Sequence, residues 1–194
     1  GILLIFDEVI TGFGRLGAPF AAQALGVVPD IITCAKGITN GAVPMGAVAV
    51  RHGVYETVVD KAPAGIELFH GYTYSGHPLA TAAGLATLAL YRTEGLFERA
   101  KDMSPAWEAG LYALRGLPHV IDLRNLGLMA AIELEPRAGA PGARAFELFL
   151  DCFQRGALVR ATGDAVALSP PLIISQPQIE QLVEILAQAL RRLP

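Results

Sequence analysis

Continuous apolar runs and helical patterns alternate in the first half of the chain. Residues 2–6 form an unbroken apolar run, which is typical of a central strand in a parallel sheet. Residues 30–34 and 46–50 indicate two further strands. A short helix is expected at 18–25, and a longer one at 78–92 with a proline at a first helical position. Residues 1–92 are therefore predicted to form an α/β unit.

The pattern changes near residues 93–95, and the second half mixes amphipathic helices with short paired strands. Residues 96–114 have helical periodicity, and Ser104-Pro105 is predicted to break or restart that helix. The remaining predicted elements are strands at 119–124 and 127–134 around Asn125-Leu126, a helix at 143–154, and hairpin strands at 157–160 and 165–168. Residues 93–194 are thus predicted to form a smaller α+β domain.

The last helix carries its own start signal. Ser175 and Gln178 have the spacing of a capping box, and Pro177 lies early in the helix. An apolar stripe at helical spacing follows, formed by Ile179, Leu182, Val183, Leu186 and Leu190. This stripe predicts one buried helix face.

Composition and charge exclude several classes of protein. Hydrophobic residues make up 53% of the chain and charged residues 17%, which indicates a core-rich globular protein. A net charge of −3 gives no basic footprint for nucleic acid or an anionic membrane. The best apolar run, residues 80–91, is too short to span a bilayer. Cys34 and Cys152 do not form a disulfide framework, which favours a cytoplasmic location.

Lys36 is the most informative residue for chemistry. It follows Cys34-Ala35 and precedes Gly37-Ile38, and it is one of only three lysines in the chain. Lysines usually occur among polar neighbours on the surface. Apolar flanks predict a poorly solvated lysine, whose lowered pKa would make it a neutral amine nucleophile.

Asp7 is the natural partner for such a lysine, because it ends the apolar run at residues 2–6. A carboxylate fixed there could hold a cationic ring nitrogen. A lysine and an acidic partner for a pyridinium nitrogen are what pyridoxal phosphate requires. Taken alone, Asp7 could equally be a strand-end cap. The pair Asp7-Glu8 is a weak metal candidate, because adjacent strand residues point to opposite faces.

Several segments together resemble the class III pyridoxal-phosphate-dependent aminotransferases. The most specific are Phe6-Asp7-Glu8-Val9-Ile10-Thr11-Gly12-Phe13-Gly14-Arg15 and Pro29-Asp30-Ile31-Ile32-Thr33-Cys34-Ala35-Lys36-Gly37, which match the family signature at the right spacing. The resemblance continues through residues 70–78, 120–125, 158–164 and 169–174. The later segments are most similar to the ω-amino acid (β-alanine):pyruvate branch. The resemblance covers nearly the whole chain but only the C-terminal half of a family member.

The resemblance implies a role for five residues. Lys36 would carry the cofactor covalently and then transfer protons as a free amine. Asp7 would bind the pyridine nitrogen, and Val9 would pack against one face of the ring. Thr73 would bind the cofactor phosphate across a dimer interface, and Arg160 would bind the substrate carboxylate.

The resemblance also implies a fold and a reaction. We expect the C-terminal part of a fold-type I large domain, with a mostly parallel sheet, followed by the small C-terminal domain. The implied reaction moves an amino group from an ω-amino acid such as β-alanine to pyruvate, in a homodimer or homotetramer. At residue 10, related branches have a glutamine near the cofactor's phenolic oxygen, and Ile10 speaks against the ornithine and γ-aminobutyrate branches.

Two alternatives stay open at this point. One is another class III enzyme with a different amine donor or a mutase activity. The other is a catalytically silent fragment, because the chain begins with Gly1 inside an apolar strand pattern. It also has no glycine-rich phosphate loop or ring-stacking aromatic residue of the kind the family has upstream. We therefore expect the isolated chain to be inactive.

Overall fold

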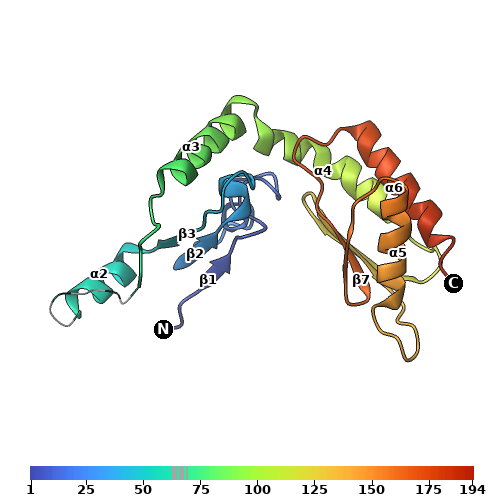
Figure 1. Ribbon diagram of the computed structural model, residues 1–194, viewed down its shortest axis with the longest axis horizontal. Helices are drawn as coiled ribbons and strands as arrows, with labels where there is room; N and C mark the ends of the chain where they lie inside the picture. Colours follow the sequence, from blue (N-terminus) through green and yellow to red (C-terminus); the bar gives the residue numbers. More distant parts are fainter. Residues whose placement is uncertain (63–64, 66–67, 69) are drawn as a thin grey trace. The chain divides into compact units, whose positions relative to one another are not determined.

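The computed structural model of the chain describes residues 1–62, 65, 68 and 70–194. The chain divides into two compact units, Gly1–Phe97 and Glu98–Pro194 (Figure 1). The sequence places the change near residues 93–95. The division in the structure falls a few residues later, and the Phe97 ring packs on Tyr91 within the first unit, with a centroid distance of 5.1 Å.

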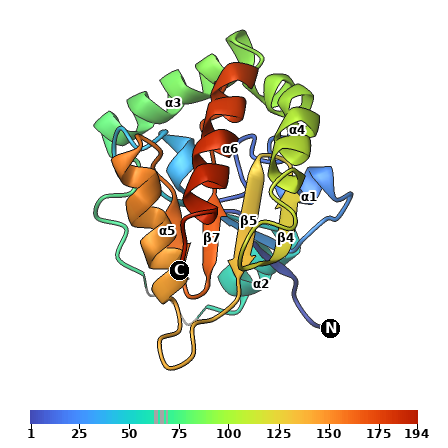
Figure 2. The same ribbon diagram turned by 90° about the vertical axis from the view of Figure 1, so that its right-hand side faces the viewer.

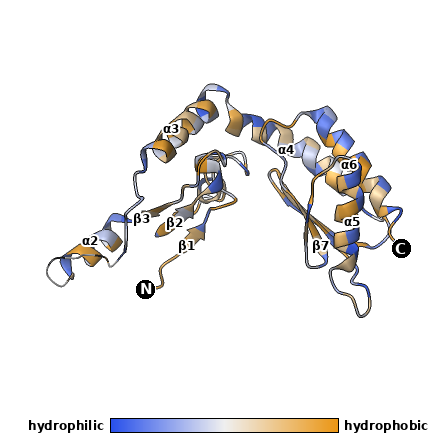
Figure 3. Ribbon diagram, in the orientation of Figure 1, coloured by the Kyte–Doolittle hydropathy of each residue, from blue (hydrophilic) through white to orange (hydrophobic). Residues whose placement is uncertain are grey.

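The first unit contains a three-stranded sheet with its middle strand shared by a parallel and an antiparallel pair. β2 runs parallel to β1 and antiparallel to β3. Figure 3 shows these strands coloured as hydrophobic, in agreement with the apolar runs of the sequence. The first run forms a strand only from its fourth apolar residue onward. The bounds are Ile5–Asp7 for β1, Ile31–Cys34 for β2 and Ala47–Val50 for β3.

A carboxylate fixes the amino-terminal side of this sheet. Asp30 accepts hydrogen bonds from the Leu4 backbone N–H and the Arg51 guanidinium, each at 2.9 Å. These bonds, with that from Leu4 the stronger, lower the pKa of the Asp30 carboxyl. Asp30 thus connects the segments that enter or leave all three strands.

The helices of the first unit are unequal in length. α1 (Ala21–Ala24) and the 3₁₀ turn η1 (Lys36–Ile38) are single turns, whereas α3 (Pro78–Thr93) is long. Buried Ala80 and Gly84 let α3 pack closely on η1 and the segment after it. α2 (His52–Asp60) was not predicted, and it buries none of its residues.

The second unit is an antiparallel sheet in the order β4-β5-β7-β6. The first hairpin turns through Gly127-Leu128, since Leu126 pairs with Met129. The expected turn at Asn125-Leu126 is therefore wrong by two residues. Gly127 has φ +58°, which a glycine adopts without strain. The bounds are Val120–Leu126 for β4, Met129–Leu134 for β5, Arg160–Thr162 for β6 and Ala165–Leu168 for β7.

Helices cover one face of this sheet, with α5 and α6 in front of β7 in Figure 2. α5 (Ala143–Gln154) has the predicted bounds. α6 (Gln176–Leu190) begins with the predicted capping box, in which the Ser175 N–H donates to Gln178 Oε1 at 2.9 Å. Its predicted stripe enters a core that also contains Trp107, Leu111, Ile132, Leu148 and Val166.

The predicted break at Ser104-Pro105 does not occur. α4 (Leu96–Tyr112) continues through Pro105, which is exposed. Proline removes one backbone hydrogen bond, but on the exposed side of a helix water can replace it. The burial of Trp107 and Leu111, each 1% exposed, holds the helix together beyond that point.

Two expectations concern the chain as a whole. Cys34 and Cys152 are free thiols, in agreement with the absence of a disulfide framework. In the part of the chain that the structure describes, no helix is long and apolar enough to cross a membrane.

Candidate active site

Asp7 and Lys36 lie at the same edge of the parallel pair β1–β2. Asp7 is the last residue of β1 and is in register with Thr33 of β2. Lys36 follows shortly after Cys34, the last residue of β2. The carboxyl ends of parallel strands meet at one edge of the sheet, where α/β proteins commonly bind ligands. The fold therefore brings together the two residues that the sequence selected.

The Asp7 carboxylate is exposed, and only one of its two oxygens accepts hydrogen bonds from the described residues. Its Oδ1 accepts hydrogen bonds from the Val9 N–H at 3.1 Å and from Thr33 Oγ1 at 3.4 Å. No hydrogen bond reaches Oδ2 from the described residues. One oxygen thus orients the carboxylate, and the other is available to a cationic N–H donor. Val9 follows at this edge and is half-buried.

Glu8 is an essential part of this edge that the sequence did not identify. It is 1% exposed, and its carboxylate accepts bonds from Thr11 Oγ1 at 2.6 Å and from the Ala21 and Ala22 N–H groups at 2.8 and 2.7 Å. These bonds compensate a charge that would otherwise be costly to bury. Glu8 anchors the chain between Asp7 and Val9, and it points away from Asp7 as strand alternation requires.

Lys36 is exposed, which differs from the expectation of a poorly solvated lysine. The apolar flanks are themselves only half-buried. Lys36 makes no ion pair with any residue that the structure describes. The Lys36 amine therefore lies at the carboxyl edge of β1–β2, and no acidic side chain among the described residues neutralises it.

The neighbouring thiol is not a competing nucleophile. Burial raises the pKa of Cys34, which precedes the turn. The thiol consequently stays protonated at neutral pH, where the thiolate is the reactive form. At this edge Lys36 is exposed, whereas Cys34 is half-buried.

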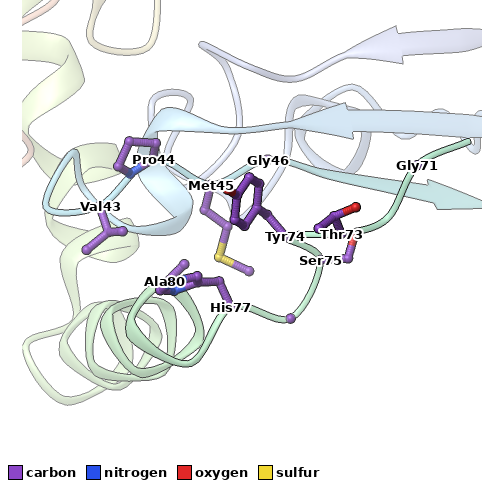
Figure 4. A pocket seen from close by; sticks show the side chains of 11 residues that line it. Val43, Pro44, Met45, Gly46, Gly71, Thr73, Tyr74, Ser75, His77 and Ala80 are labelled. Atoms are coloured by element: carbon purple, nitrogen blue, oxygen red, sulfur yellow. The ribbon is translucent and has the colours of Figure 1, made fainter.

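Thr73 lies in a separate pocket of about 770 Å³. Figure 4 shows the loop 71–77 passing opposite Pro44 and Met45, with Thr73 and Ser75 on that loop. Neither Asp7 nor Lys36 lines this pocket. Thr73 is exposed, and the structure does not group it with the lysine.

Arg160 belongs to the second unit, at the start of the edge strand β6. Its neighbours Val159 and Ala161 contact the helix-covered core, so alternation directs Arg160 to the opposite face. Across the sheet, Arg160 is paired with Ala167, and Ala167 with Ala131. Ala131 is in turn paired with Arg124, so the two arginines lie in one cross-strand row. Arg124 is neutralised by Asp122 and Glu133, each at 2.6 Å, whereas Arg160 makes no ion pair among the described residues.

Comparison with known proteins identifies the family. The fold is that of the fold-type I pyridoxal-phosphate-dependent transaminases, and residues 1–190 match the family model "Aminotransferase class-III". This chain belongs to the class III aminotransferases, which depend on pyridoxal phosphate. The expected fold class, family and cofactor are thereby confirmed.

Three relatives are similar along almost the whole chain. An omega-aminotransferase of Caulobacter vibrioides is 59% identical over 189 residues, and a beta-alanine–pyruvate aminotransferase of Pseudomonas aeruginosa is 44% identical over 191 residues. Each match covers 97% of this chain. The crystal structure of an (S)-enantioselective omega-transaminase from Thermomicrobium roseum superposes with a TM-score of 0.89 at 40% identity, over 98% of this chain. The chain spans 43% of the length of each of these three proteins.

Proposed function

We propose that this chain provides the lysine-bearing part of an aminotransferase that moves an amino group from an ω-amino acid, such as β-alanine, to pyruvate. The observation that carries the proposal is the placement of Asp7 and Lys36 at the same carboxyl edge of β1–β2. The names of the Caulobacter and Pseudomonas relatives, at 59% and 44% identity, support the choice of substrates.

The residues at this edge fit pyridoxal phosphate. When bound, this cofactor supplies a protonated pyridine ring that accepts electrons from the substrate carbon. The free Oδ2 of Asp7 would hold the ring N–H and keep it protonated. Lys36, exposed and unpaired, would hold the cofactor covalently. Its released amine would then move a proton between the substrate carbon and C4′ of the cofactor.

Val9 and Ile10 would shape the space around the ring. Val9 is half-buried beside Asp7 and would contact one ring face. Ile10 is 48% exposed and cannot donate a hydrogen bond to the phenolic oxygen of the cofactor. This apolar residue supports the ω-amino acid branch, in agreement with the higher identity to its members.

Thr73 would bind a cofactor phosphate that belongs to a second subunit. Its pocket is lined by neither Asp7 nor Lys36, as such an exchange between subunits would require. The hydroxyl and nearby backbone N–H groups of the loop 71–77 would hold the phosphate. A homodimer is therefore part of the proposal.

Arg160 would bind the carboxylate shared by β-alanine and pyruvate. A planar guanidinium binds a carboxylate through two parallel hydrogen bonds. Arg160 is exposed and lacks an ion pair among the described residues, whereas Arg124 in the same cross-strand row is already neutralised. The free guanidinium is therefore the better anion receptor of the two.

The activity can be tested in a hybrid enzyme, in which this chain replaces the matching segment of the Caulobacter relative. Arg160→Ala in the hybrid enzyme should weaken the transition-state binding of β-alanine and pyruvate by about 2–4 kcal/mol each, the scale for losing a charge-assisted pair. An arylalkyl amine donor without a carboxylate should lose much less. With pyruvate as the acceptor, the measurement compares the loss of kcat/KM for β-alanine with the loss of kcat/KM for the arylalkyl amine.

Arg124→Ala is the matched control, because it removes a charge from the same face of the sheet without removing the proposed receptor. It should leave both donors nearly unchanged. Equal losses for β-alanine and the arylalkyl amine in Arg160→Ala would mean that Arg160 acts through folding rather than recognition.

A further inference from the structure

We propose that Tyr91 is a positioning residue for Lys36, because its hydroxyl holds the backbone of the turn on which Lys36 lies. Tyr91 is on α3, and the turn is η1, so the two segments are far apart in sequence. This inference rests on the proposed role of Lys36, but the contact itself does not depend on the cofactor.

The bond from Tyr91 is a short one and comes from outside the turn. Tyr91 Oη donates to the Gly37 carbonyl oxygen at 2.7 Å. Within the turn, the Thr39 N–H reaches the Lys36 oxygen at 3.3 Å and the Asn40 N–H reaches the Gly37 oxygen at 3.4 Å. Both are longer than a usual N–H···O bond. The Ile38 N–H also donates to the Ala35 oxygen, at 3.1 Å. Two of the three backbone bonds within the turn are therefore long, and the bond from Tyr91 adds a short one from outside it.

Lys36 needs such support because its backbone is strained. Its φ is +41°, in the left-handed region that side chains with a Cβ rarely adopt. Such a conformation persists where the surrounding structure over-determines it. A relaxed turn would move the Lys36 side chain relative to Asp7.

Aromatic packing places the Tyr91 hydroxyl at Gly37. The rings of Tyr91 and Phe13 stack at 6.1 Å with an interplanar angle of 18°. A Cβ on Gly37 would lie 2.7 Å from the Phe13 Cβ, so only glycine permits this approach. The Phe97 ring also packs on Tyr91, with a centroid distance of 5.1 Å. Tyr91 itself is 7% exposed.

The hydroxyl remains a donor over the working pH range. Burial raises the pKa of Tyr91, and the nearby Arg15 opposes this effect only in part. A protonated phenol is required, since the Gly37 carbonyl can only accept.

The test is Tyr91→Phe, which removes the hydroxyl and keeps the ring. Tyr112→Phe, on α4, is the matched control. In the full 194-residue chain and again in the hybrid enzyme, hydrogen exchange of the Ile38–Asn40 amides is followed by mass spectrometry. We expect Tyr91→Phe to accelerate this exchange about two- to tenfold, as expected for one lost hydrogen bond, and Tyr112→Phe to leave it unchanged.

A second readout is covalent labelling of Lys36 in the hybrid enzyme. Pyridoxal phosphate at a subsaturating concentration is reduced with borohydride, and the labelled lysines are mapped. The Lys36 fraction should fall several-fold in Tyr91→Phe while Lys61 and Lys101 are unchanged. Unchanged exchange and unchanged labelling in Tyr91→Phe would overturn the role of Tyr91 and leave the proposed function intact. Absence of Lys36 labelling in the unsubstituted hybrid would instead contradict the proposed function, and the exchange rates would still decide the role of Tyr91.

Discussion

Replacing Lys36 with alanine in the hybrid enzyme should lower the rate of amino transfer by at least about 10⁴-fold. The substitution removes both the covalent attachment point and the amine that moves the proton, and no other amine lies at this edge among the described residues. Some noncovalent cofactor binding should remain, since Asp7 is untouched. The measurement is the single-turnover rate with β-alanine at saturating cofactor.

Lys61→Ala and Lys101→Ala are the controls, because both lysines are exposed and lie outside the candidate site. Both variants should retain nearly full activity. A small primary amine added to Lys36→Ala should restore part of the rate, which would separate a missing amine from a misfolded protein. A Lys36→Ala variant with near-normal turnover would refute the assignment.

Asp7→Asn should lower the rate by at least about 10²–10³-fold, the scale of losing one preorganised electrostatic partner. The amide keeps the shape of the carboxylate but cannot hold a positive charge on the ring nitrogen. The Val9 N–H and Thr33 Oγ1 donate to Oδ1 of Asp7 and so orient its carboxylate. The rate should be measured with the cofactor bound to saturation, so that a loss of affinity is not mistaken for a loss of catalysis.

Asp60→Asn at the end of α2 is a suitable control for the loss of one carboxylate charge. It should have little effect on turnover. A near-normal rate in Asp7→Asn with the cofactor fully bound would exclude the proposed role of Asp7.

The elements that the sequence predicted well are those determined by local chemistry. The helix at Ala143–Gln154 and the capping box of Ser175 and Gln178 depend on residues within one or two turns. The break expected at Pro105 failed because burial of Trp107 and Leu111 is a tertiary effect that local signals do not contain. α2 was missed because it has no buried face to impose a clear periodicity.

The candidate site shows the same division. The placement of Asp7 and Lys36 at one edge follows from two apolar runs that pair in parallel, and the motif identified both residues. The exposure of Lys36 was not predicted, because the half-burial of its apolar neighbours does not extend to Lys36 itself. The hydrogen bond from Tyr91 to Gly37 joins residues 54 positions apart, so no local sequence pattern predicts it. From the sequence, Glu8 drew attention only as the neighbour of Asp7 in a weak metal candidate.

The most direct test of the account is to locate the cofactor on the chain. The hybrid enzyme is saturated with pyridoxal phosphate, reduced with borohydride, digested, and mapped by mass spectrometry. The account predicts a pyridoxyl group on Lys36 and none on Lys61 or Lys101. A pyridoxyl group on either of those lysines, with Lys36 unmodified, would contradict it.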